Sequence, residues 1–274
     1  MKARAYAKVN LTLEVHGIRG DGYHALSSLV LPVSLWDDVE VEPAESLSCD
    51  SGFPDDLCIK AAKILDPGRG AAIHVVKRIP CGGGLGGGSA DAAATLAALN
   101  ELWGLGKAED EMVQIAAQVG SDVPALLLGG LVVMEGRGEV VRRALPPGTV
   151  ARPVDLVLAS PGVFSSTAEV YAKCTSRPSG GPSATAAAVA ALASGDIDAL
   201  AAAMVNDLQE PALSLHPEMA DALVSLRTAG AVAAMASGSG STVFGLARDA
   251  AQAAAIAGRL NARGLKAWAV RSVL

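Results

Sequence analysis

Between a predicted strand and a predicted helix lies the run Pro80-Cys81-Gly82-Gly83-Gly84-Leu85-Gly86-Gly87-Gly88-Ser89-Ala90, and this run decides the fold. Residues 73–79 before it are rich in β-branched side chains and predict a strand. Residues 90–102 after it repeat apolar side chains at the helical period. Glycines at such a junction let backbone N–H groups converge on an anion, and the start of the helix adds its positive dipole end. The run therefore predicts a phosphate-binding loop.

Two common phosphate loops fit this run poorly. A Walker A loop needs a lysine directly after its last glycine, and none follows here. The letters of a dinucleotide loop, GxGxxG, are met by Gly82, Gly84 and Gly87. That fold expects a second strand ending in an acidic residue about 20 residues further on, whereas the chain is still in the helical pattern at Glu101. A dehydrogenase is therefore disfavoured.

The patterns on both sides of the loop predict a mixed α+β protein of two domains. Before and after the loop, strands are predicted at 5–15, 26–33 and 39–42, and helices at 56–65 and 109–118. The second half begins with a strand at 154–159 and alanine-rich helices between 166 and 226, broken by a loop at 180–182. It ends with strands at 231–236 and 242–246, a helix at 249–263 and a strand at 266–273. Turn residues at Pro146 and Pro147 place the boundary between domains 1–147 and 148–274.

Composition excludes some classes of function. The 22 basic and 28 acidic residues give a net charge of −6 without a basic block, so no nucleic-acid partner is expected. No signal peptide and no apolar run of membrane-spanning length is visible, which predicts a cytoplasmic protein without a membrane partner. The cysteines, which are Cys49, Cys58, Cys81 and Cys174, lack CxxC spacing and are interpreted as reduced thiols rather than disulfides or a zinc site.

The loop resembles the ATP loop of the GHMP kinases, and other motifs of that family follow in order. These are Ala7-Lys8-Val9-Asn10-Leu11, Asp21-Gly22-Tyr23-His24, Gly120-Ser121-Asp122-Val123-Pro124, Glu135-Gly136-Arg137-Gly138-Glu139 and Ser237 to Phe244. The long glycine run and the Asp-Gly-Tyr-His motif are similar to the members that serve non-mevalonate isoprenoid biosynthesis. Those members phosphorylate the 2-hydroxyl of a cytidine diphosphate conjugate of methylerythritol.

The resemblance implies an N-terminal ATP-binding α/β domain, a C-terminal ferredoxin-like α+β domain and an active site in the cleft between them. It implies ATP as co-substrate, Mg²⁺ as cofactor and the cytidine diphosphate conjugate as small-molecule substrate. Two alternatives stay open: another GHMP kinase, of the homoserine or mevalonate type, and a non-catalytic nucleotide-binding regulator of the same fold. A monomer and a homodimer are both compatible with the sequence.

Site residues follow from the matching motifs. The resemblance implies Lys8 and Asp122 as the catalytic pair, with Asp122 accepting the proton of the attacking hydroxyl. It implies ATP binding by Lys77 and by the loop from Pro80 to Ala90. Substrate binding is implied for Asn10, Tyr23, His24 and Thr167. Taken alone, Lys8 could be a solvent-facing strand residue, Asp122 a capping or turn aspartate, and Tyr23-His24 part of a capped loop with a buried ring.

Some positions depart from the family pattern. Ala90 stands where a second serine is common, which leaves Ser89 as a candidate Mg²⁺ ligand and the other metal ligands unknown. Asp56 replaces an asparagine on the adenine side, so that contact is not carried over. Asp91 brings negative charge near a triphosphate, and it either faces away or reaches Mg²⁺ through water. Residues 176–203 match no motif of the family.

Overall fold

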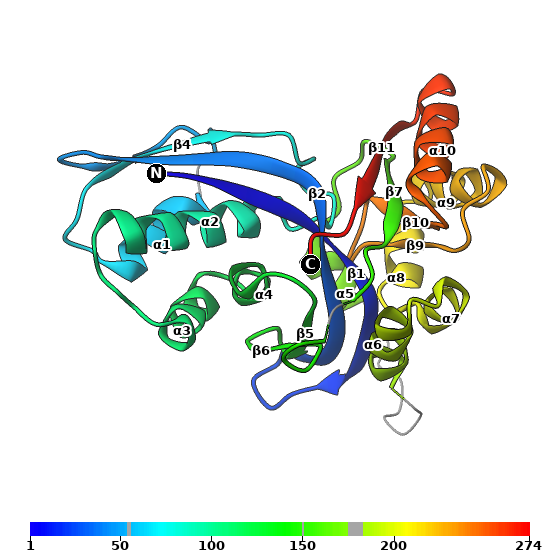
Figure 1. Cartoon of the computed structure of the whole chain (residues 1–274), viewed down its shortest axis with the longest axis horizontal. Helices are drawn as coiled ribbons and strands as arrows, with labels where there is room; N and C mark the ends of the chain where they lie inside the picture. The colour runs from blue at the N-terminus through cyan, green and yellow to red at the C-terminus, as the bar shows by residue number, and fades with distance from the viewer. Residues whose placement is uncertain (54–55, 150, 175–182) are drawn as a thin grey trace.

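Two long antiparallel strands, β1 (Lys2–Ile18) and β2 (His24–Pro43), run through the middle of the protein and connect its two halves (Figure 1). The structure is a computed structural model and describes residues 1–53, 56–149, 151–174 and 183–274. β1 is buried without a break from Ala7 to Leu13, because layers of the protein cover both of its faces there. The C-terminus returns to these strands, where the Val273 N–H donates to the Pro32 carbonyl at 2.9 Å.

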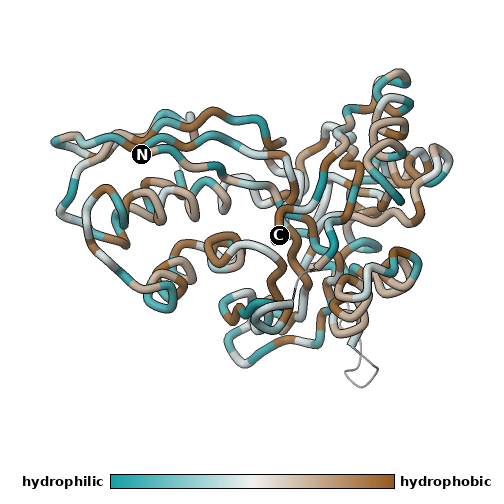
Figure 2. Tube along the Cα trace, in the orientation of Figure 1, coloured by the Kyte–Doolittle hydropathy of each residue, from teal (hydrophilic) through white to brown (hydrophobic). Residues whose placement is uncertain are grey.

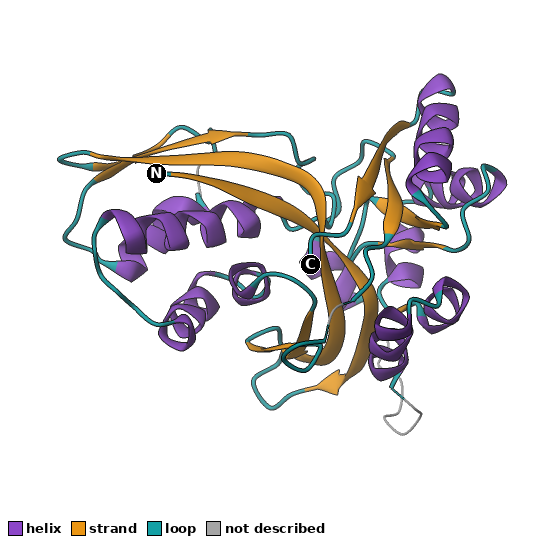
Figure 3. Cartoon of the chain, in the orientation of Figure 1, coloured by secondary structure: helices purple, strands orange, loops and turns teal. Residues whose placement is uncertain are grey.

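The N-terminal half is a sheet with helices on one face (Figure 3). In the described part of the chain its strands lie in the order β3-β4-β2-β1-β8, and β5 pairs with both β2 and β6. The bounds are β3 (Leu47–Cys49), β4 (Ala71–Val76), β5 (Val132–Gly136), β6 (Val140–Arg143) and β8 (Val205–Asn206). The helices are α1 (Leu57–Leu65), α2 (Gly87–Leu102), α3 (Glu109–Val119) and α4 (Val123–Leu128). Small alanine side chains let α2 pack closely beneath the sheet, and its central residues are almost all buried.

The C-terminal half is built on a second, antiparallel sheet in the order β11-β7-β10-β9. These strands are β7 (Asp155–Ser160), β9 (Ala234–Ala236), β10 (Val243–Ala247) and β11 (Lys266–Arg271). The helices are α5 (Thr167–Ala172), α6 (Ala184–Ser194), α7 (Ile197–Ala203), α8 (Gln209–Leu215), α9 (Glu218–Thr228) and α10 (Ala250–Ala262). The strand order is that of a split β-α-β, ferredoxin-like unit, as expected. The loop predicted at 180–182 lies outside the described residues.

The main error of the sequence-based prediction concerns β2. The sequence predicts two strands, at 26–33 and 39–42, but the structure has one continuous strand of 20 residues. Pro32 is tolerated inside it because the register with β1 shifts between Tyr6 and Lys8, and Pro32 lies opposite Lys8 at this irregularity. The short elements β3, β5, β6, β8 and α4 were not predicted, and α2 begins at Gly87 rather than Ala90.

One hydrophobic core spans both halves. Leu11 and Leu31 from the long strands pack in the same cluster as Leu158 and Phe244 from the second sheet, and all four are fully buried. Figure 2 shows hydrophobic residues along these central strands and hydrophilic ones on outer loops. Among the helices of the described ranges, none has the length and apolar character to cross a membrane. The domain division between residues 147 and 148 stays a prediction.

Candidate active site

A cleft of about 1090 Å³ lies where the two halves meet, and it gathers nearly all the residues that the motifs single out. Its walls come from the glycine loop, β1, the start of β2, the start of α4, α5 and residues 238–239. The predicted site residues that line it are Lys8, Asn10, Tyr23, His24, Lys77, the loop from Pro80 to Ser89, Asp122 and Thr167. Ala90 is buried behind the loop and is absent from the wall.

The carbonyl groups of the glycine loop are held by both halves of the protein. The Leu85 carbonyl accepts from the Lys8 N–H at 3.0 Å, and the Gly83 carbonyl accepts from the Thr242 N–H at 3.0 Å. The Ser237 hydroxyl donates to the Gly84 carbonyl at 2.9 Å. Because the first turn of a helix leaves its N–H groups without intrahelical acceptors, the start of α2 at Gly87 offers donors to an anion beside this anchored loop.

Gly84 is the tightest point of this anchoring, which gives a first prediction. Its φ is +72°, and a Cβ there would lie 2.1 Å from the Ser237 carbonyl oxygen. We expect Gly84→Ala to lower the free energy of unfolding by at least about 2 kcal/mol and to weaken ATP binding, because the loop must move away from its anchor. Urea unfolding and calorimetric ATP titration measure the two effects.

The control for this prediction is Gly104→Ala. Gly104 has a similar φ of +63°, but a Cβ there meets nothing within 4 Å. The control therefore carries only the backbone strain of a left-handed alanine. Equal loss of stability in the two variants would contradict the proposed role of close packing at Gly84.

Lys8 and Asp122 come together at the bottom of the cleft. Lys8 Nζ lies 3.4 Å from Asp122 Oδ2, and it donates to Asn10 Oδ1 at 2.7 Å. Asn10 is held in turn by donating to Ser28 Oγ at 2.8 Å. Lys8 is only 4% exposed, so it is not a solvent-facing strand residue. Asp122 precedes α4 but makes no side-chain capping hydrogen bond, so its carboxylate is directed to Lys8 instead.

The irregular pairing of β1 explains how these polar groups reach the cleft. The register between β1 and β2 shifts between Tyr6 and Lys8, and again between Asn10 and Thr12. Such irregularities re-aim side chains relative to a regular strand. Lys8 and Asn10 each lie beside a shift, and both are buried.

Lys77 contacts the side chains of Asp37 and Asp91 beside the glycine loop. Lys77 Nζ lies 2.6 Å from Asp37 Oδ2 and also contacts Asp91 Oδ2. Asp37 is fully buried and accepts from the Ile79 N–H at 2.8 Å, which fixes the chain entering the loop. A contact between Lys77 and the nucleotide stays a prediction. Asp91 faces Lys77, and burial raises the pKa of its carboxyl to about 7.

This raised pKa predicts a pH dependence of stability. Between the ordinary pKa of aspartate and about 7, the folded protein holds a proton on Asp91 that the unfolded chain has released. Proton binding by Asp91 therefore favours the folded state at low pH, and this contribution to the free energy of unfolding is lost as pH rises through about 7. We expect the free energy of unfolding of the wild type, minus that of Asp91→Asn, to fall between about pH 5 and pH 8, by at most about 1.4 kcal/mol per pH unit.

Asn is a suitable replacement because it keeps an oxygen acceptor for Lys77 and cannot titrate. Urea unfolding of both proteins across this pH range measures the difference. A difference that stays constant with pH would show that Asp91 does not titrate there.

The other end of the cleft carries aromatic rings. The rings of His24 and Tyr171 lie 5.3 Å apart between centroids, and the Arg137 guanidinium lies 5.0 Å from the centre of the Tyr23 ring. Thr167 shares a hydrogen bond of 2.9 Å with the Ser239 hydroxyl. All of these residues line the cleft.

Sequence reasoning missed Tyr171 and Arg137 as candidate site residues. Arg137 stands inside a motif that was recognised, but no role was assigned to it. Tyr171 follows Thr167 by four residues on α5, and this spacing places two side chains on one helix face. That spacing was the available signal.

The structure shows where the residues that depart from the family pattern, and their neighbours in the loop, lie. Asp56 caps α1, accepting from the Cys58 N–H at 2.6 Å and the Ile59 N–H at 3.2 Å. Ser89 is half-buried on the cleft wall in the first turn of α2. Asp91 Oδ1 is buried and has no hydrogen-bond partner among the described residues.

Comparisons with known proteins agree with this geometry. The profile for the GHMP kinases N terminal domain matches residues 56–130, and that for the GHMP kinases C terminal matches residues 188–266. Two similar relatives are each called 4-diphosphocytidyl-2-C-methyl-D-erythritol kinase. The one from Symbiobacterium thermophilum is 38% identical and covers 100% of both chains. The one from Streptomyces avermitilis is 42% identical over 95% of this chain and 92% of its own.

Solved structures give the same result. A crystal structure of 4-(cytidine 5'-diphospho)-2C-methyl-D-erythritol kinase superimposes with a TM-score of 0.84 and 36% identity, covering 99% of each chain. The L. major mevalonate kinase in complex with R-mevalonate has a TM-score of 0.72 at 21% identity, covering 99% of this chain and 95% of its own. At that identity the second likeness concerns the fold alone.

Proposed function

The chain belongs to the GHMP kinases, and within them to the 4-diphosphocytidyl-2-C-methyl-D-erythritol kinases, and on that premise we propose that it transfers the γ-phosphate of ATP to the 2-hydroxyl of 4-diphosphocytidyl-2-C-methyl-D-erythritol. The products are ADP and the 2-phosphate, in the non-mevalonate route to isoprenoid precursors. The observation that carries the residue roles is the buried contact between Lys8 and Asp122, beside the anchored glycine loop.

The glycine loop and the start of α2 bind the phosphates of ATP. Phosphoryl transfer requires the transferred group to be positioned in line and its negative charge to be offset. Backbone N–H groups at the start of α2 supply donors that are fixed before ATP arrives, because the loop carbonyls are already held by β1 and by residues 237–242. The Lys77–Asp37 ion pair holds the entrance to the loop in place.

Asp122 and Lys8 act on the acceptor hydroxyl. Asp122 is 31% exposed at its side chain, so its carboxylate is open to the cleft and can accept the proton of the attacking hydroxyl. Lys8 Nζ, held by Asn10, orients this carboxylate and offsets the negative charge that develops on the attacking oxygen. The two groups are near enough to act on one oxygen atom.

The aromatic end of the cleft binds the cytidine. A flat pyrimidine ring is well matched by the rings of Tyr23, His24 and Tyr171, which offer faces for stacking. Burial, followed by the nearby charge of Asp122, holds the pKa of Tyr171 above its ordinary range, so its ring stays a neutral phenol. Thr167 and Ser239 add hydroxyl groups on the same side.

Mg²⁺ is the metal that ATP chemistry implies, and the residues present suit it. It prefers oxygen ligands and keeps several waters. The Ser89 hydroxyl and the Asp91 carboxylate, whose buried Oδ1 has no hydrogen-bond partner in the described part of the chain, would hold it. When bound, Mg²⁺ neutralises charge on the phosphates.

A substrate comparison tests the proposed function. Purified protein with ATP and Mg²⁺ is given the cytidyl substrate, homoserine or mevalonate in separate reactions, and ADP is measured with a coupled assay. We expect ADP only with the cytidyl substrate. Turnover of homoserine or mevalonate instead would contradict the substrate assignment. Tight ATP binding without ADP from any of the alcohols would identify a non-catalytic regulator.

A further inference from the structure

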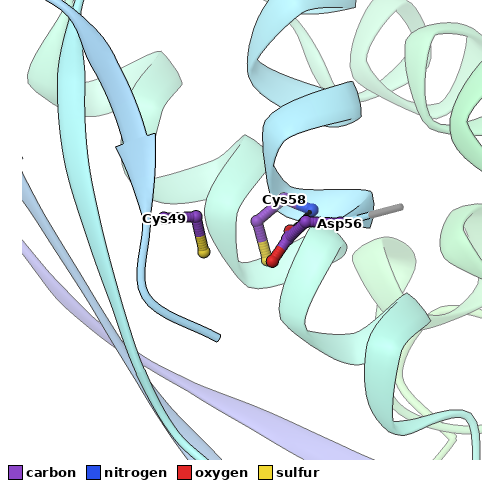
Figure 4. A group of neighbouring side chains, drawn as sticks. All are labelled: Cys49, Asp56 and Cys58. Atoms are coloured by element: carbon purple, nitrogen blue, oxygen red, sulfur yellow. Dashed lines mark hydrogen bonds between the residues drawn. The ribbon is translucent and has the colours of Figure 1, made fainter. Parts of the chain in front are cut away.

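Cys49, Asp56 and Cys58 form a cluster that the kinase reaction does not use (Figure 4). Cys49 is the last residue of β3, while Asp56 and Cys58 lie at the start of α1. Their sulfur and carboxylate oxygen atoms all lie within 4.8 Å of one another. Among the described residues, this is the group of cysteine, histidine and acidic side chains that comes close enough to share an ion.

We propose that these three residues bind a thiophilic divalent cation of the Zn²⁺ class. Zinc accepts two thiolates and a carboxylate, and three protein ligands leave a fourth position for water. In a tetrahedral zinc site, with bonds of about 2.0–2.3 Å, the donor atoms are about 3.5–3.8 Å apart. A contraction of at most about 1.3 Å from the present separation, which is within 4.8 Å, completes the site.

The surroundings of Asp56 suit a metal-binding carboxylate. Its Oδ1 accepts from the N–H groups of Cys58 and Ile59, and its Oδ2 accepts from the Ser51 hydroxyl. Ligating carboxylates in proteins are usually oriented by hydrogen bonds of this kind. Asp56 is thus fixed by the helix that also carries Cys58, which leaves only Cys49 to approach from β3.

The two sulfur atoms differ in exposure. Cys58 is buried at the start of α1, and Cys49 is partly exposed at the end of β3. A bound cation removes the proton from a coordinating thiol, so both sulfurs become ligands when the metal binds.

This site is distinct from a magnesium site. Mg²⁺ takes oxygen ligands and Zn²⁺ takes thiolates, so the two ions select different places. Asp56 and Cys58 also line the cleft that contains the glycine loop. A cation here would join β3 to α1 and fix the wall that encloses the nucleotide end.

Co²⁺ is the probe, because a cobalt–thiolate bond gives a charge-transfer absorption band that a cobalt–oxygen site lacks. The apoprotein is kept reduced with a phosphine and titrated with Co²⁺ in the absence of ATP. We expect one Co²⁺ per chain with a thiolate band, displacement by Zn²⁺ and no displacement by excess Mg²⁺. Absence of the band, or displacement by Mg²⁺, would overturn the proposal.

Matched variants locate the ion. Cys81→Ser/Cys174→Ser keeps the cluster and should bind Co²⁺ as the wild type does. Cys49→Ser/Cys58→Ser should lose at least about 100-fold in Co²⁺ affinity, and Asp56→Asn, which preserves a capping side chain, about tenfold or more. Equal Co²⁺ affinity in the two double-cysteine variants would place the ion elsewhere.

Melting temperatures distinguish loss of the metal site from loss of the fold. Zn²⁺ should raise the melting temperature of the wild type and of the Cys81→Ser/Cys174→Ser variant, because a ligand that binds the folded state stabilises it. If Cys49→Ser/Cys58→Ser fails to fold, Cys49→Ser alone replaces it, since Cys49 is partly exposed at the end of β3. If Zn²⁺ raised the melting temperature of Cys49→Ser as much as that of the wild type, the proposed site would be refuted.

Discussion

Replacing Asp122 by asparagine should lower turnover at least about 100-fold while ATP binds as tightly as before. Asparagine has nearly the same shape but cannot accept the proton of the attacking hydroxyl, and general-base catalysis contributes about 10²–10⁴ in rate. The glycine loop does not depend on the Asp122 carboxylate, because its carbonyls are held by Lys8 N–H, Thr242 and Ser237. Steady-state assays and calorimetric ATP titration measure the two effects separately.

The matched control for Asp122 is Asp110→Asn. Asp110 lies in the exposed first turn of α3, so its replacement by asparagine is the same chemical change made outside the cleft. Melting temperatures of both variants show whether the lost contact with Lys8 disturbs the fold. Turnover within about threefold of the wild type in folded Asp122→Asn would remove Asp122 from the role of base.

Replacing Lys8 by methionine should lower turnover by about 10²–10³, an effect similar to loss of one oxyanion-stabilising donor. Methionine keeps the unbranched stem that packs under Gly86, where an added Cβ would lie 3.1 Å from Lys8 Cγ. The main-chain hydrogen bond from Lys8 to Leu85 is also kept, so the loop stays anchored. We expect kcat to fall and the KM for ATP to change little.

The double variant separates a catalytic pair from two independent contributions. Because Lys8 acts through Asp122 at 3.4 Å, Lys8→Met/Asp122→Asn should be little slower than the worse single variant. Lys2→Met, on the exposed start of the same strand, serves as the control. If the loss of turnover in the double variant equalled the product of the two single losses, Lys8 and Asp122 would not share a role on one oxygen atom.

Local patterns were enough to predict the loop, most helices and most of the strand order of the second half, whereas its ferredoxin-like arrangement was implied by the resemblance to the family. They failed where pairing with a distant strand decides the conformation. The sequence predicted separate strands at 26–33 and 39–42, but Trp36, Asp37 and Asp38 between them pair with β1, so β2 is continuous. The short strand β8 was invisible because its two residues pair with the middle of β1, and nothing local marks such a partner.

The site was predictable only in part for the same reason. Motifs named Lys8 and Asp122 one by one, and the resemblance to the family suggested that they meet. The link from Lys77 to Asp37 joins residues 40 positions apart, and no motif or spacing pointed to it. The tertiary fold also gathers Cys49 and Cys58, whose spacing in the sequence gave no reason to expect a shared ion.

The anchoring of the glycine loop limits how the enzyme can move during its cycle. The carbonyls of Gly83 and Gly84 accept hydrogen bonds from Thr242 and Ser237 of the C-terminal half, and the Leu85 carbonyl accepts one from Lys8 of β1. The loop is therefore hydrogen-bonded to both halves. The shared core beneath it includes Leu31 and Leu158. A wide hinge opening would break these hydrogen bonds and expose the shared core. Substrates must therefore enter through small displacements of surface segments. Neither half, expressed separately, would keep a working nucleotide pocket.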